Sequence, residues 1–72
     1  MNKFEIMIAS LPHRERPVVE IYYDNMYWVQ ISQEKEELVI QFYSHPNEKY
    51  WEFSYEEALQ VLEKAKNKLV GT

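Results

Sequence analysis

The stretch Phe53 to Gly71 holds the strongest helix signal in the chain, and it constrains what the rest must form. Ser54 stands at an N-cap position and Glu57 follows three residues later, which is the pattern of a capping box. Gly71 is placed to end the helix in a left-handed conformation. The apolar residues form one stripe, so this helix of about 16 residues needs another layer to lie on. The stripe consists of Ala58, Leu59, Leu62, Ala65 and Leu69.

The rest of the sequence is typical of β-strands, because apolar residues alternate with polar ones. The connections between these segments are short, which favours an antiparallel meander. We therefore expect an α+β fold, with an antiparallel meander sheet of four to five strands and one C-terminal helix packed on one face (βββββα). The predicted strands are Lys3 to Ala9, Val18 to Tyr23, Tyr27 to Ser32, Glu37 to Tyr43 and a short fifth strand, Lys49 to Phe53.

The hairpin at Asp24 and Asn25 decides which side chains face the helix. A regular two-residue turn would leave Val29 exposed, which is the poorer arrangement. We therefore expect a three-residue loop, or a bulge near Met26, that corrects the alternation. Trp28 would then face outward. The residues turned toward the helix would be Tyr27, Val29 and Ile31.

Size and composition narrow the class of protein. The 72 residues suffice for one domain (1–72) with a small core. There is no cysteine, so disulfides, thiolate zinc sites and cysteine nucleophiles are excluded. No apolar run approaches the ~20 residues that span a bilayer, and no cleavable signal segment is evident, so a cytoplasmic protein is expected. The segment Leu11 to Pro17 contains two prolines and predicts a loop with few ordered partners.

The charge is distributed unevenly. Residues 1–53 carry nine acids and five bases, whereas residues 54–72 carry three of each, within a net charge of −4. This excess argues against nucleic acid as a ligand and favours a basic partner. Gly71 is the single glycine, which excludes a glycine-rich phosphate loop. His13 and His45 lie in loops without a second ligand at a suitable spacing, so we expect no catalytic, metal or cofactor site.

One helix can cover only one face of the sheet, so the other face should present its side chains to solvent. Tyr, Trp and Met are enriched at the centres of protein interfaces, and acids around them would steer a basic partner. The same rings have two other uses, as cross-strand pairs that stabilise a thin sheet or as a homodimer face. The outward residues are Met7, Tyr22, Trp28, Tyr43 and Tyr50, with Glu20, Asp24 and Glu52 among them.

Three segments carry a resemblance to a known class: EIMIASLPHRE, VVEIYYDNMYWVQISQE and LVIQFYSHPNEKYWEFSYEEALQVLEKAKNKL. Together they resemble the small acidic immunity proteins encoded beside bacterial polymorphic toxins, including those of contact-dependent growth inhibition systems. The likeness covers nearly the whole chain and lies in the β-rich body, the Asp-Asn turn before an aromatic pair and the Trp-Glu-Phe segment before the helix. It implies a non-enzymatic protein that binds one cognate toxin, often a nuclease, in the cytoplasm.

We predict the contacts with such a basic toxin from face and charge. No membrane, nucleic acid or cofactor is expected to take part. A homo-oligomeric structural or regulatory module stays open as an alternative, as does a small hydrolase, which would need a concave pocket with convergent polar groups. The predicted partner contacts are Glu20, Tyr22, Asp24, Trp28 and Tyr43, with Glu34, Glu36 and Glu37 as rim charges.

Overall fold

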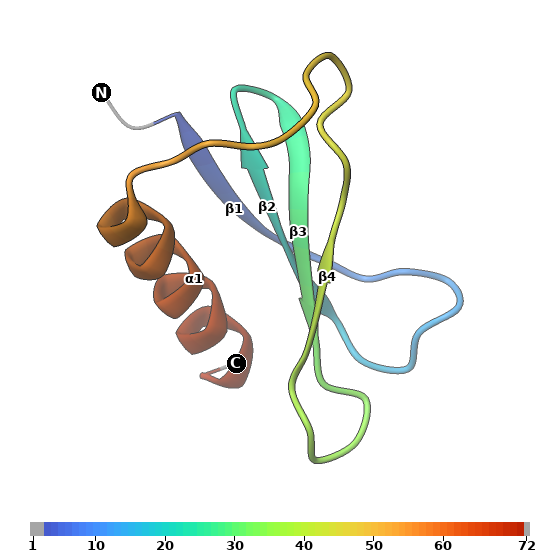
Figure 1. Ribbon diagram of the computed structural model, residues 1–72. Coiled ribbons are helices and arrows are strands. Elements are labelled where there is room, and N and C mark those ends of the chain that lie inside the picture. The colour runs from blue at the N-terminus through green and yellow to red at the C-terminus, as the bar shows by residue number, and fades with distance from the viewer. Residues whose placement is uncertain (1–2, 72) are drawn as a thin grey trace.

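The computed structural model describes residues 3–71, which form four strands followed by one helix (Figure 1). The strands make one antiparallel sheet in the order β1-β2-β3-β4, and α1 packs on one face of it. This confirms the predicted α+β meander with four strands. The elements are β1 (Phe4–Ala9), β2 (Val18–Tyr23), β3 (Met26–Ser32), β4 (Val39–Phe42) and α1 (Tyr55–Val70).

The predicted fifth strand does not form. The segment Lys49 to Phe53 is irregular and crosses the hairpin end of the sheet on its way to α1 (Figure 1). Trp51 and Phe53 still pack against the core, as the sequence predicts. The indole N–H of Trp51 donates a 2.8 Å hydrogen bond to the Tyr43 carbonyl, so a side chain fixes this crossing segment where a strand ladder was expected.

The start of α1 agrees with the sequence, but its end does not. The Ser54 hydroxyl accepts a 3.4 Å hydrogen bond from the Glu57 N–H, which confirms the N-cap. Gly71 has φ −81°, so the predicted left-handed C-cap is wrong. Its N–H instead donates to the Asn67 carbonyl at 2.9 Å. A Cβ at this position would lie 2.7 Å from that same oxygen, so the close approach, and not a positive φ, is what requires glycine.

The buried stripe of α1 is centred one position away from the predicted stripe. Val61, Ala65 and Leu69 are buried, whereas Leu59 is 48 % exposed. α1 lies over β1, β2 and β3, and its backbone does not come close to that of β4. Leu59 lies outside the buried side of α1, which Val61, Ala65 and Leu69 form. The prediction that Leu59 belongs to the buried stripe was wrong for this reason.

The β2–β3 hairpin has a regular two-residue turn. Tyr23 pairs with Met26, and Asp24 and Asn25 adopt φ values of 51° and 65°, as a type I′ turn requires. The expected three-residue loop is therefore wrong. The alternative expectation, a bulge near Met26, is confirmed, because the register shifts between Ile21 and Tyr22, which places the extra residue in β3 shortly after Met26.

The shift makes Trp28 the extra residue of a β-bulge. Tyr22 pairs with Tyr27 and Ile21 pairs with Val29, which leaves Trp28 between the two pairs. Trp28 is 5 % exposed and lies in the core, so the predictions that Trp28 faces outward and Tyr27 inward were both wrong. The prediction that Val29 and Ile31 face the core is confirmed, because the bulge restores the alternation of sides after Trp28.

An aromatic cluster closes the hairpin end of the core. The Trp28 ring lies 4.8 Å from that of Phe53 and 5.6 Å from that of Phe4, measured between centroids. Phe53 also contacts Phe4 at 5.0 Å and Tyr23 at 4.9 Å. These rings join β1, β2 and β3 to the segment that leads into α1. Trp28 is therefore a structural residue at the centre of this cluster.

Candidate protein-binding face

The sheet face opposite α1 is divided into a covered half and an open half. The β1–β2 loop, residues 10–17, runs on this side of the sheet (Figure 1). Side chains near that loop are buried even though the helix is on the other side. They are Val18, Gln30 and Ser32, with exposed fractions of 0, 4 and 2 %.

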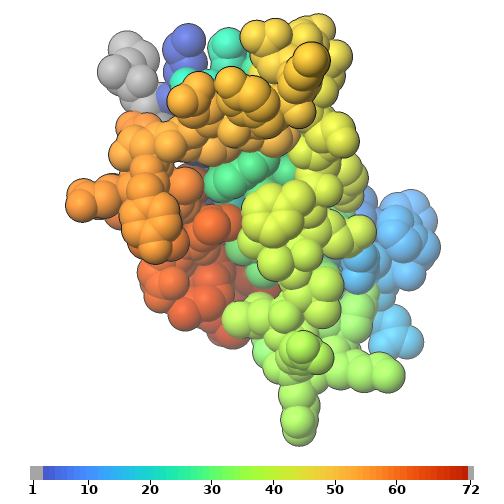
Figure 2. All heavy atoms as spheres, viewed as in Figure 1, coloured from blue at the N-terminus to red at the C-terminus, as the bar shows by residue number. Residues whose placement is uncertain are grey.

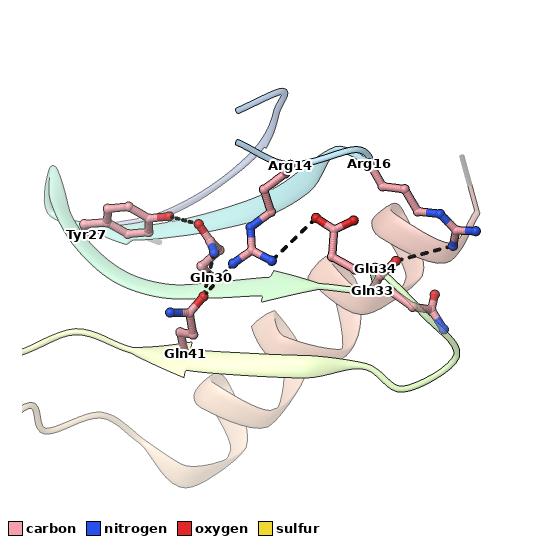
Figure 3. A network of polar contacts seen from close by, with 7 residues as sticks. All are labelled: Arg14, Arg16, Tyr27, Gln30, Gln33, Glu34 and Gln41. Atoms are coloured by element: carbon pink, nitrogen blue, oxygen red, sulfur yellow. Dashed lines mark hydrogen bonds and ion pairs between the residues drawn. The ribbon is translucent and has the colours of Figure 1, made fainter. Parts of the chain in front are cut away.

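Arg14 fixes the loop over the sheet (Figure 3). Its guanidinium donates a 3.0 Å hydrogen bond to Gln41 Oε1 and lies 3.6 Å from a Glu34 carboxylate oxygen. Arg16 adds a 3.3 Å hydrogen bond to the Gln33 carbonyl. The expectation that this loop has few ordered partners was therefore wrong. The contact joins residues far apart in the sequence, and no local pattern signals it.

Amide side chains extend this network across β4 and β3 (Figure 3). Gln30 Nε2 donates to Gln41 Oε1 at 2.8 Å, and the Tyr27 hydroxyl donates to Gln30 Oε1 at 3.1 Å. The buried amide of Gln30 is thus bonded at both its oxygen and its nitrogen, as a buried polar group requires. The network connects the loop residue Arg14 to the aromatic residue Tyr27.

The open half of this face carries three stacked tyrosines. The ring centroids of Tyr22 and Tyr27 are 4.8 Å apart, and those of Tyr27 and Tyr43 are 4.4 Å apart. Glu20 accepts hydrogen bonds from the Tyr22 and Tyr27 hydroxyls, each at 3.2 Å. Tyr27 has one hydroxyl proton, so it serves either Glu20 or Gln30 at a given moment. We call Tyr22, Tyr27, Tyr43 and Glu20 the tyrosine face.

The tyrosine face remains open to solvent at its rim. Tyr43 is 37 % exposed, and Met7, which pairs with Glu20 across β1 and β2, is 50 % exposed. Glu5 pairs with Tyr22 at the same edge and is also exposed. The row of tyrosine rings is thus bordered by Met7 and by the carboxylates of Glu5 and Glu20.

The hydroxyls of Tyr22 and Tyr27 stay protonated over the physiological range. Burial raises the pKa of Tyr27, and the negative charge of Glu20 raises it further. Burial and Glu20 also raise the pKa of Tyr22. These hydroxyls are therefore hydrogen-bond donors, and the raised pKa works against a role as nucleophile or general base.

The structure brings together some of the predicted contact residues and separates others. Glu20, Tyr22 and Tyr43 lie together, and Asp24 is exposed at the adjacent hairpin tip. Trp28 is not available, because it is buried in the core. Tyr27 was missed, although continuing the alternation through a two-residue turn would have placed it opposite Tyr22.

The predicted rim charges do not surround this face. Glu34, Glu36 and Glu37 lie in the β3–β4 loop, at the opposite end of the sheet from the β2–β3 turn (Figure 1). Glu34 is also paired with Arg14, so its charge is partly compensated within the chain. Tyr50 and Glu52 lie in the irregular segment before α1, outside the sheet.

His45 has a structural role in the loop after β4. Its Nδ1 accepts 3.0 Å hydrogen bonds from the backbone N–H groups of Asn47 and Glu48, and its ring lies 4.5 Å from that of Trp51. Residues 3–71 contain no group of three or more His, Asp or Glu side chains arranged to hold a metal ion. Among the described residues, no helix has both the length and the apolar character needed to cross a membrane.

Comparison with protein family models, with characterised proteins and with solved structures gives no match. The candidate site is therefore defined by its own geometry, as an open face of stacked tyrosines beside carboxylates.

Proposed function

We propose that this chain is a non-enzymatic protein-binding domain that neutralises a basic toxin, as the resemblance to small immunity proteins implies. The observation that carries the proposal is the tyrosine face. Three tyrosine rings lie in a row on the strands opposite α1, with Tyr27 at 4.8 Å from Tyr22 and 4.4 Å from Tyr43, and the Glu20 carboxylate beside them. Tyrosine is among the residues that contribute most to binding at protein interfaces.

The charge of the chain suits such a partner. A nuclease toxin has to attract phosphate, so its cleft is expected to be basic. Glu5 and Asp24 are exposed at the edges of the tyrosine face, and the whole chain has a net charge of −4. Acids at a rim mainly increase the association rate, while buried aromatic anchors slow dissociation. The tyrosines would therefore slow dissociation of the complex, and the carboxylates would speed its formation.

The rings are held in place before any partner arrives. Tyr27 is packed between two other rings and hydrogen-bonded to Glu20, and the Arg14 network supports it from the side. Side chains that are already ordered lose less conformational entropy on binding. Arg14 and Gln30 therefore support the binding face even if they never contact the partner.

The test uses the toxin that the proposal predicts, which is expected as the C-terminal domain of a large protein encoded by an adjacent reading frame. Co-expression of this chain should restore growth of cells that produce that domain, and calorimetry should show a complex. Tyr22→Ala should weaken binding by about 30-fold or more, as expected for an interface hot spot. Tyr55→Ala is the matched control, because Tyr55 is 78 % exposed at the start of α1.

Two results would contradict the proposal. The first is growth inhibition that persists at full expression of the folded chain. The second is a complex whose affinity is unchanged by both Tyr22→Ala and Tyr43→Ala while Tyr55→Ala weakens it, because binding would then use another surface.

A further inference from the structure

β4 is an edge strand whose side chains are open on both faces of the sheet. It is the last strand in the order β1-β2-β3-β4. No residue from 38 to 43 is charged or is proline, which are the devices that usually protect an edge from pairing. The exposed fractions are 37 % for Leu38, 47 % for Val39, 42 % for Ile40 and 64 % for Phe42.

The hydrogen-bonding direction shows which backbone groups this edge offers. The Tyr43 N–H donates to the Trp28 carbonyl at 2.9 Å, so the backbone groups of Tyr43 point toward β3. These directions alternate along an antiparallel strand. The N–H and C=O groups of Ile40 and Phe42 therefore point away from β3, toward the free edge.

An apolar hollow lies between α1 and the same strand, because the helix does not reach β4. Ile31, Leu38, Ile40 and Leu62 line it, with Glu63 and Lys66 at its rim. Figure 2 shows β4, in yellow-green, at the surface beside α1, in orange to red. Glu63 and Lys66 form an ion pair of 3.0 Å, so the charges at the rim compensate each other.

We infer that β4 pairs with β4 of a second copy of this chain, around a two-fold axis at Gln41. This places Ile40 opposite Phe42 of the second copy and Phe42 opposite its Ile40. Both residues present their backbone groups to the edge, so each of the two pairs forms two hydrogen bonds. The four strands of each copy join into one sheet of eight, with both helices on the same side.

The geometry of the strand favours a second copy over an unrelated protein. The two-fold axis is perpendicular to the sheet, so the face that carries α1 in one copy continues into the same face of the other copy. Ile40 and Phe42 of the two copies therefore meet on that face. Ile40 and Phe42 then form cross-strand pairs of an aromatic with a β-branched residue, which are favourable. Gln41 meets an uncharged copy of itself, and the guanidinium of Arg14 beside it is paired with Glu34 of its own chain.

The opposite edge of the sheet does not offer this arrangement. β1 carries Glu5 within the strand, and Lys3 precedes it. Charged side chains in or beside an edge strand disfavour pairing with another edge. Pairing through β4 is therefore expected to stop at a dimer and not to extend into a fibre.

The area available agrees with a modest affinity. Strand pairing would cover the backbone edge of β4 and only part of the exposed surface of its side chains. The area buried by two copies should therefore be below about 1,000 Å², in the range of weak interfaces. We therefore expect a dimer that forms at micromolar concentrations.

Sedimentation equilibrium from 1 to 500 μM tests this inference. The wild-type chain should change from monomer to dimer over this range. Ile40→Lys should shift the dissociation constant upward at least 30-fold, whereas Ile8→Lys should leave it unchanged. The two positions are matched, since Ile8 on β1 is 39 % exposed and Ile40 is 42 % exposed. A wild-type chain that is monomeric at 500 μM, or a dimer abolished by Ile8→Lys and not by Ile40→Lys, overturns the inference.

A cross-linking variant tests the position of the axis. The chain has no cysteine, so Gln41→Cys introduces a single thiol. In the expected pairing the two copies of residue 41 form a non-hydrogen-bonded pair with Cα atoms about 4.5 Å apart, a separation that a disulfide spans. Mild oxidation should yield a disulfide dimer, faster than for Met7→Cys on β1. Equal rates for two folded variants, as checked by circular dichroism, would exclude this axis.

Discussion

Arg14 and Gln41 are 27 residues apart in the sequence and are joined by a 3.0 Å hydrogen bond that holds the β1–β2 loop against the sheet. Gln41 also accepts from Gln30, so one carbonyl oxygen connects the loop to β3 as well as β4. The loop buries the half of the sheet that lies away from the hairpin. The tyrosines at the hairpin end remain as the open part of this face.

Arg14→Ala is expected to lower the free energy of unfolding by about 1 to 3 kcal/mol, because it removes the hydrogen bond of a charged group that holds the β1–β2 loop on the sheet. Most of this loss should come from the hydrogen bond, since the ion pair with Glu34 is long, at 3.6 Å, and partly exposed. Urea denaturation followed by circular dichroism measures it. Arg16→Ala is the control, with an expected loss below about 0.5 kcal/mol, since Arg16 is exposed. Equal losses for both variants would argue against a special role of Arg14.

Trp28→Ala should destabilise the domain by about 3 to 5 kcal/mol, because it removes the ring at the centre of the aromatic cluster. A domain of this size has little stability beyond that, so the variant should be largely unfolded at 25 °C. Loss of the circular dichroism signal and a lowered thermal midpoint would show it. Trp28→Phe should retain the fold with a smaller loss. A folded Trp28→Ala variant of normal stability would contradict the buried position of Trp28.

The regular periodicities allowed most of the architecture to be predicted, because they reflect which face of each element is buried. The register of the β2–β3 hairpin was the exception. Keeping Val29 in the core requires an extra residue somewhere in β3, but local sequence does not say where. The structure inserts it at Trp28, which exchanges the sides of Tyr27 and Trp28. Arg14 escaped prediction for another reason, since its partner Gln41 is brought near only by the completed sheet.

The stability of α1 on the sheet should depend on which leucine is removed. Leu69→Ala is expected to cost about 2 to 5 kcal/mol, because Leu69 is 9 % exposed and packs in the core. Leu59→Ala should cost less than about 1 kcal/mol in the monomer, since Leu59 is 48 % exposed. The pair shares one substitution and one helix, so propensity effects cancel. Urea midpoints at low micromolar concentration measure the difference. A larger loss of stability for Leu59→Ala than for Leu69→Ala would mean that α1 packs on the sheet through the face that carries Leu59.

Alkaline pH should destabilise the domain through Tyr27. The folded state raises the pKa of Tyr27, so above about pH 10 the unfolded chain releases a proton that the folded chain retains. The contribution of Tyr27 to the free energy of unfolding is therefore constant below pH 10 and falls as the pH rises beyond it. Urea midpoints between pH 8 and 11.5 should decrease less steeply for Tyr27→Phe than for wild type. In Glu20→Gln, which removes the neighbouring charge, Tyr27 should ionise at lower pH. An unchanged slope in Tyr27→Phe would assign the effect to other groups.

Salt should separate the two proposed associations, because they differ in their electrostatics. A basic partner is attracted to a chain of net charge −4, so raising sodium chloride from 0.05 to 0.5 M should weaken that complex, mainly by slowing association. Two copies of the chain repel each other, and β4 is uncharged, so the same change should leave the dimer unaffected or strengthen it. Calorimetry for the complex and sedimentation for the dimer measure the two trends. A dimer that dissociates with salt would mean that ion pairs, and not the apolar edge of β4, hold the copies together.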